Sequence, residues 1–328
     1  MTLLTPARPG ETTAPRPVPW HRIAWVTWRQ HRAALAGAAV LLAALAAYMW
    51  RDGLQLHQAY AAAAACRPAT SAACAAVTST ATSTYASHVQ LLAEMLQAVP
   101  ALIGAFTAAP VLARELETGT YRYAWTQGFG RQRWALGKLV PLAIVLAAAA
   151  TAVSQLFSWY SQPFLAAAKL ASLAPDLFAL RGLAFAAWTL AAFTIGALAG
   201  MVIRRVVPAI AATLLTYTAL ALTTDIYLRP RYLTPLSIKN SGPPPGAWVK
   251  GLSYTRNGKP VSQAQIFQAL RQYKVTSLQH LPHGYSWWIT YQPASRFWAF
   301  QWIEAGWLLA LCIALTGTTI WLVRRKAG

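Results

Sequence analysis

The chain carries the sequence Ala-Arg-Glu-Leu-Glu-Thr-Gly-Thr-Tyr-Arg at residues 113–122, between two long apolar segments at roughly 90–113 and 139–159. Apolar runs of about twenty residues match a helix that crosses the ~30 Å hydrocarbon core of a membrane. Charged side chains are costly inside a bilayer, so a dense charged turn belongs at the membrane face. We therefore expect residues 113–122 to form a surface that a separate protein contacts.

The composition places the chain among membrane proteins, because 56% of its residues are apolar and only 11% are charged. Four further apolar segments lie at roughly 33–50, 183–203, 206–225 and 300–323. Backbone polar groups find no water in lipid, so each segment should be a helix. The predicted fold class is an all-α polytopic membrane protein with six transmembrane helices. An even number of spans puts both termini on one side.

The distribution of Lys and Arg predicts the orientation. These residues number fifteen in the 66 residues of segments 1–32, 114–138, 202–205 and 324–328, but thirteen in the 136 residues of segments 51–89, 160–182 and 226–299. The denser set should face the cytoplasm, which predicts a multi-pass protein with both termini cytoplasmic. The basic residues that give the net charge of +20 are spread along the membrane flanks and the outer segment 226–299, and the sequence has no recognisable nucleic-acid-binding module, so no nucleic-acid partner is expected.

The N-terminal region divides into two parts. Residues 1–19 contain five prolines and are predicted to be a disordered cytoplasmic leader. Residues 20–32 bring Trp25, Trp28, Arg29 and Arg32 to the start of the first span, where indole rings and guanidinium groups favour the membrane interface. This favours an interfacial elbow helix, and a cytoplasmic extension of the first span is the alternative.

Three cysteines divide between two settings. Cys66 and Cys74 lie eight positions apart in the first outer segment, on the predicted oxidising side, whereas Cys312 lies within the sixth span. A disulfide between Cys66 and Cys74 is expected, and closing its short loop contributes roughly 2.5 kcal/mol on the chain-entropy estimate. Cys312 is interpreted as a small apolar packing residue.

A few acidic residues fall in or near the predicted spans. Glu94 lies in the second span, Asp225 ends the fifth, and Glu304 lies near the outer end of the sixth. Each is expected to reach water or a basic partner, with either a structural role or a role in substrate passage or protonation. Glu94 and Glu304 are the candidates for a translocation path. Pro100 predicts a bend in the second span.

The charged turn has signals for a small surface helix. Arg114, Glu115 and Glu117 should extend the second helix, Gly119 permits a break, and Thr120 can cap a short helix through Gln127. Tyr121, Arg122 and Trp125 would lie on that short helix. The alternative is a solvated turn whose charges only enforce topology.

Three motifs carry a family resemblance. Arg-Glu-x-x-x-Gly-x-Tyr-Arg at 114–122, with Gly137-Lys138 further on, resembles the loop that carries the coupling helix in type-2 ATP-binding cassette permeases. The segments 25–32 and 291–304 are similar to a subgroup of the same family. The resemblance, to the bacterial exporter type, implies six helices in the bacterial cytoplasmic membrane, a second permease in a homodimer or heterodimer, and two copies of a separate ATPase. It assigns ATPase coupling to Glu115, Gly119, Tyr121 and Arg122.

The segment 226–299 is larger than the outer hairpins usual in that family, and its local signals predict a folded unit. Asn257-Gly258 favours a tight hairpin, and residues 262–265 fit a capping box. The helix that follows should have Ile266, Phe267, Leu270 and Tyr273 along one side. We expect a small α+β extracytoplasmic cap between helices five and six. His280 and His283 lack an evident third ligand and are not interpreted as a metal site.

No phosphate-binding loop occurs in the sequence, so the chain is predicted not to be an enzyme and to hold no cofactor, while ATP and Mg bind the partner ATPase. The predicted function is the permease subunit of an ATP-driven exporter of an amphipathic or hydrophobic substrate. A membrane scaffold or sensor whose outer cap binds a ligand is the alternative. The predicted domains are 1–19, 20–32, 33–225 with the coupling loop 114–138, 226–299 and 300–328.

Overall fold

Long helices make up most of the computed structural model, which describes residues 20–68, 71–119, 131–167, 171–276, 278, 282 and 284–325. The helices are α1 (Trp20–Ala65), α2 (Ala72–Leu102), α3 (Ala109–Thr118), α5 (Arg131–Ala167), α6 (Pro175–Phe178), α7 (Ala184–Ile203), α8 (Val206–Thr223), α9 (Gln263–Gln272) and α10 (Phe297–Arg325). π-Helical turns η1 (Ile103–Ala108) and η2 (Thr224–Leu228) extend α2 and α8, and the 3₁₀ turns are η3 (Arg229–Arg231) and η5 (Ala294–Arg296). Pro100 lies in the last turn of α2, three residues before the start of η1.

Five helical stretches of the described residues are long and apolar enough to cross a membrane. They are Ala72–Thr118, Gln132–Ala167, Ala184–Ile203, Val206–Arg231 and Ala294–Arg325. Each contains one of the six predicted spans. The remaining predicted span, 33–50, lies within the continuous helix α1, which is not among the five. The sixth crossing therefore stays a prediction.

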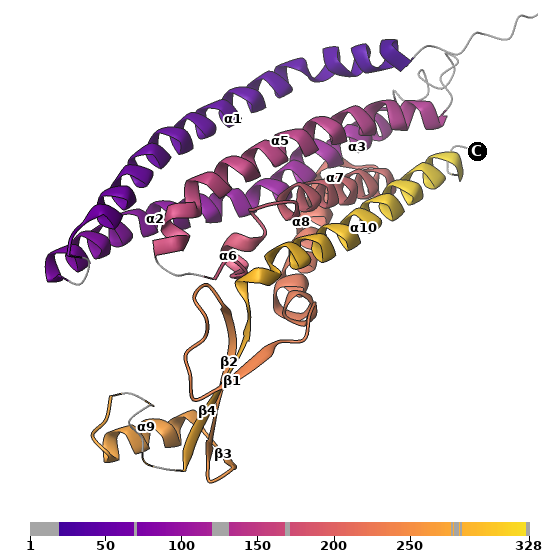
Figure 1. The fold of residues 1–328 in the computed structure, drawn as a ribbon. Coiled ribbons are helices and arrows are strands. Elements are labelled where there is room, and N and C mark those ends of the chain that lie inside the picture. The colour runs from indigo at the N-terminus through magenta and orange to yellow at the C-terminus, as the bar shows by residue number, and fades with distance from the viewer. Residues whose placement is uncertain are drawn as a thin grey trace, which may run out of the picture.

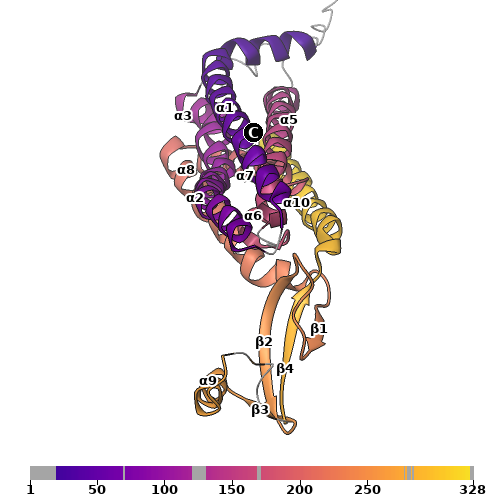
Figure 2. The same ribbon diagram turned by 60° about the vertical axis from the view of Figure 1, so that its left-hand side comes forward.

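The helices lie alongside one another in an elongated bundle (Figures 1 and 2). The beginning of α1 and the end of α10 lie at one end, together with the ends of α3 and α5 that flank residues 120–130 (Figure 1). The β-sheet lies beyond the opposite end. The helix ends next to the segments that are dense in Lys and Arg thus lie at one end of the bundle, as the distribution of these residues along the sequence predicts.

Helix α7 is the core of the bundle, and it packs closely against η1 and α3. Most of its side chains are buried. A methyl group at Gly196 of α7 would overlap the backbone oxygen of Gly104 in η1, and one at Gly200 would overlap the oxygen of Ala109. Small residues let helix backbones approach this closely, which is how membrane helices gain van der Waals contact without a hydrophobic driving force.

The structure places the three cysteines in two different settings. Cys66 and Cys74 form the predicted disulfide, with their Cα atoms 5.6 Å apart, and it links the end of α1 to the start of α2. Cys312 is buried in α10 within an apolar cluster that includes Trp188 and Leu308.

The sheet between α8 and α10 is antiparallel, with strand order β1-β4-β2-β3. Its strands are β1 (Leu236–Lys239), β2 (Trp248–Arg256), β3 (Lys259–Val261) and β4 (Tyr285–Gln292). The hairpin predicted at Asn257-Gly258 is confirmed: these residues have φ angles of 50° and 79°, and Arg256 pairs with Lys259 across the turn. Both positive φ angles suit a two-residue hairpin turn.

Helix α9 covers part of one face of the sheet. The predicted capping box is present, since Ser262 accepts a hydrogen bond from the backbone of Gln265 and the Gln265 side chain accepts one from Ser262. Ile266 is buried in a cluster with side chains of β2 and β4, whereas Phe267 is 53% exposed. The predicted apolar side was wrong at Phe267, because successive helical residues differ by about 100° in direction. Tyr273 directly follows the helix, and its ring lies edge-on against Tyr285 of β4.

The close contact of α7 with η1 gives a testable prediction. Replacing Gly196 with Ala should destabilise the protein by about 1–3 kcal/mol, since the helices must separate to admit the methyl group. Gly306→Ala in α10 is the matched control, because nothing lies within 4 Å of a methyl group there. Thermal unfolding of the purified variants, followed by size-exclusion chromatography, measures the difference. Equal melting of both variants would contradict the packing.

Candidate functional site

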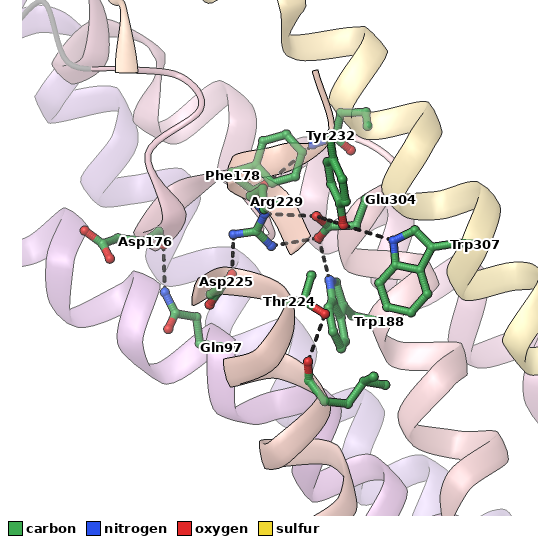
Figure 3. A network of polar contacts seen from close by, with 12 residues as sticks. Gln97, Asp176, Phe178, Trp188, Thr224, Asp225, Arg229, Tyr232, Glu304 and Trp307 are labelled. Carbon is green, nitrogen blue, oxygen red and sulfur yellow. Dashed lines mark hydrogen bonds and ion pairs between the residues drawn. The ribbon is translucent and has the colours of Figure 1, made fainter. Parts of the chain in front are cut away.

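A buried ion pair lies where the bundle meets the sheet. Glu304 of α10 is fully buried and accepts two hydrogen bonds from Arg229 of η3. Arg229 Nε lies 2.9 Å from Oε2, and Nη2 lies 2.7 Å from Oε1. Figure 3 shows the planar guanidinium facing the carboxylate, the two-point geometry that makes Arg–carboxylate pairs strong. The sequence predicted that Glu304 would reach either water or a basic partner, and in the structure it pairs with a basic partner, Arg229.

Two aromatic side chains complete the hydrogen bonds of Glu304. Trp188 Nε1 in α7 donates to Oε1 at 2.7 Å, and the Tyr232 hydroxyl donates to Oε2 at 3.1 Å. Tyr232 in turn accepts from Trp307 Nε1 at 2.9 Å (Figure 3). Burial and the Glu304 carboxylate raise the pKa of Tyr232, so its hydroxyl stays protonated and keeps donating. Each carboxylate oxygen thus has two donors, which offsets its loss of hydration.

Arg229 also has contacts on its other sides. Its guanidinium lies 4.7 Å from the ring centroid of Phe178 and forms an ion pair with Asp225, one helical turn earlier. The Asp225 side chain is 41% exposed and borders a small cavity. The network therefore joins α6, α7, η2, η3 and α10, immediately before the chain enters β1.

A second polar cluster braces the charged turn at the opposite end of the bundle. Glu115 of α3 pairs with Lys138 of α5 and accepts a hydrogen bond of 3.1 Å from Trp134 Nε1. Glu117 accepts a hydrogen bond of 3.0 Å from the backbone nitrogen of Val206, the first residue of α8. These contacts connect the end of α3 to α5 and to α8.

The structure describes only part of the predicted coupling segment. Arg114 is exposed, Glu115 is half-buried, and Gly119 ends α3 with a left-handed φ of 74°. The predicted contact residues Thr120, Tyr121, Arg122 and Trp125 lie outside the described residues, as do His280 and His283.

The remaining predicted residues lie in the first two helices. Glu94 is exposed in α2, where it accepts a hydrogen bond from Gln90 at 3.0 Å. The predicted elbow residues Trp25, Trp28, Arg29 and Arg32 lie in the first part of α1, which continues without a break to Ala65. Arg29 and Arg32 are exposed. The interfacial position of this part stays a prediction.

Sequence reasoning missed two buried polar groups. Arg229 was counted only among the basic residues of an outer segment, although it is the partner of Glu304. Asp52 of α1 accepts a hydrogen bond of 2.6 Å from the Tyr160 hydroxyl, and its other oxygen lies 3.3 Å from His88 Nδ1. These partners are 36 or more positions apart in the sequence, so no local pattern marks them.

Long apolar helices held together by buried polar contacts define a multi-pass membrane protein. A family model described as "ABC-2 membrane transporter related" matches residues 39–229, which is more than half of the chain. The chain therefore belongs to this family of membrane transporter components. No curated protein and no solved structure matches it. The matched region ends at Arg229, where the chain leaves the bundle for the sheet.

The buried ion pair predicts a specific pattern of stability. Arg229→Met should destabilise the protein by about 3–5 kcal/mol, because it leaves the Glu304 carboxylate buried without its cation. The double variant Arg229→Met/Glu304→Leu should recover much of this loss, since it removes both charges. Asp225→Asn should have a smaller effect because that side chain is partly exposed. Melting temperatures of the three variants test the pattern, and a double variant no better than Arg229→Met would contradict it.

Proposed function

We propose that this chain is the permease subunit of an ATP-driven exporter that moves an amphipathic or hydrophobic substrate out of the cytoplasm or the inner leaflet. It would work beside a second permease, as a homodimer or heterodimer, with two separate ATPase subunits that bind ATP and Mg. Membership of the transporter family supports the membrane role. The observation that carries the coupling role is the braced end of α3.

The brace explains how a force at the charged turn reaches the rest of the bundle. Through Glu115 and Glu117, the end of α3 is tied to α5 and to the first residue of α8. The close contact of η1 and α3 with α7 continues this connection into the core. A partner that binds the turn differently in its ATP and ADP states would therefore shift α3, α5, α7 and α8 together.

The sheet and α9 are proposed as an extracytoplasmic cap. Support comes from their position at the end of the bundle opposite to the beginning of α1 and the end of α10 (Figure 1). The segment 226–299 contains nine Lys and Arg and no Asp or Glu. The Glu304 network attaches this segment to the bundle, so movements of α7 and α10 would reach the cap.

The proposed orientation can be tested by cysteine labelling in a background where Cys66, Cys74 and Cys312 are replaced by Ser. An impermeant reagent applied to intact cells should label Asn257→Cys and should not label Trp125→Cys. Permeabilised cells provide the control, because both positions should then react. Labelling of position 125 in intact cells would contradict the orientation.

The brace predicts that Glu115→Gln uncouples the complex. The change leaves Lys138, which is buried, without its counter-ion, and substrate-stimulated ATP hydrolysis by the reconstituted complex should fall roughly tenfold or more. The charge-swapped variant Glu115→Lys/Lys138→Glu should restore much of the stimulation because it restores the pair.

Insertion and folding of these variants are checked by size-exclusion chromatography of the permease alone. Unchanged stimulation in Glu115→Gln would show that the turn only enforces topology, and would remove the main structural support for the coupling role.

A further inference from the structure

Two neighbouring cavities lie between α2 and α6, toward the sheet end of the bundle. The larger, of about 400 Å³, extends to α5, and the smaller, of about 100 Å³, extends to α7 and α8. Gln97 lines both, and its amide donates a hydrogen bond of 2.7 Å to the backbone oxygen of Asp176 (Figure 3). The larger cavity alone has the size of sites that hold drug-sized molecules.

Carboxylates gather around these cavities. The chain has only eight acidic residues against 28 Lys and Arg, yet Glu94 and Asp176 line the larger cavity and Asp225 lines the smaller. Within the described residues, neither Glu94 nor Asp176 forms an ion pair. Among the described residues that line the cavities, the cation is Arg229, which is already engaged by Glu304 and Asp225. An anion placed here would meet two carboxylates without a counter-ion.

Apart from Gln90 and Gln97, the other side chains of the wall are apolar or aromatic. Val89, Phe164 and Leu177 line the larger cavity, and Phe185, Trp188 and Tyr217 line the smaller. These surfaces suit a hydrocarbon or aromatic body, and aromatic faces also attract organic cations. They are unsuited to a hydrated metal ion, which needs several oxygen ligands around it.

We propose that these adjoining cavities bind an amphipathic organic cation, with its charge near Glu94 and Asp176 and its apolar body against Phe164 and Leu177. The inference rests on the proposed export function in one respect, that the bound cation is a transport substrate. Glu94 and Asp176 are both exposed, so the charged end can reach its position without opening the bundle.

Direct binding to the full-length permease tests the site without any ATPase. The probe is tetraphenylphosphonium, and tetraphenylborate of nearly the same size and opposite charge is the comparison, both measured by equilibrium dialysis in discs of zwitterionic lipid. The phosphonium should bind saturably and the borate should not. Glu94→Gln/Asp176→Asn should weaken phosphonium binding roughly tenfold or more, whereas Gln90→Glu, which adds a carboxylate to the same wall, should strengthen it.

Glu11→Gln is the matched control, because it removes a carboxylate of the predicted leader 1–19 and should bind the phosphonium as the unmodified chain does. Equal binding of borate and phosphonium, or unchanged affinity in the double variant, would overturn the inference. The export function is tested separately by ATPase stimulation with the partner subunit. Absence of phosphonium binding together with stimulation by other compounds would overturn the cation site alone and leave the exporter standing.

Discussion

The fully buried carboxylate of Glu304 is the constraint on which the sheet end of the bundle depends. Removing an ion's only counter-charge in such a place costs about 3–5 kcal/mol, several times the roughly 1 kcal/mol of an ordinary neutral hydrogen bond. Arg229, Trp188 and Tyr232 can satisfy Glu304 together only if η3, α7 and the chain entering β1 hold their observed places. The network thereby fixes how the bundle is joined to the sheet.

The two polar clusters and the glycine contact have complementary roles. Glu115 with Lys138 connects helices at one end of the bundle, and Glu304 with Arg229 connects them at the other. Between them, α7 packs against η1 and α3 at Gly104 and Gly196, where a methyl group would not fit. In the proposed function, α7 would carry a displacement from the charged turn to the sheet through these connections.

Local sequence signals predicted local structure well. The capping box at Ser262 and the turn at Asn257-Gly258 depend on residues within a few positions of one another, and the disulfide of Cys66 with Cys74 closes a short loop. The apolar segments were also found, although the helices extend beyond them. Phe267 was misplaced because apolar residues next to each other on a helix cannot both face the same sheet.

The candidate site was predicted only in part, for a physical reason. Glu304 could be recognised as a charge in an apolar segment, but its partner Arg229 comes from a position 75 residues earlier. Likewise the grouping of Glu94 with Asp176 exists only once α2 and α6 are packed together. Such contacts between distant segments leave no periodic pattern in the sequence.

The most direct test of the central claim is to isolate the full-length chain from its native membrane after mild cross-linking and to identify its partners by mass spectrometry. The account predicts a separate ATPase subunit that carries a phosphate-binding loop, cross-linked to residues within 114–138. Reproducible isolation without any such ATPase, under conditions that preserve other membrane complexes, would contradict it.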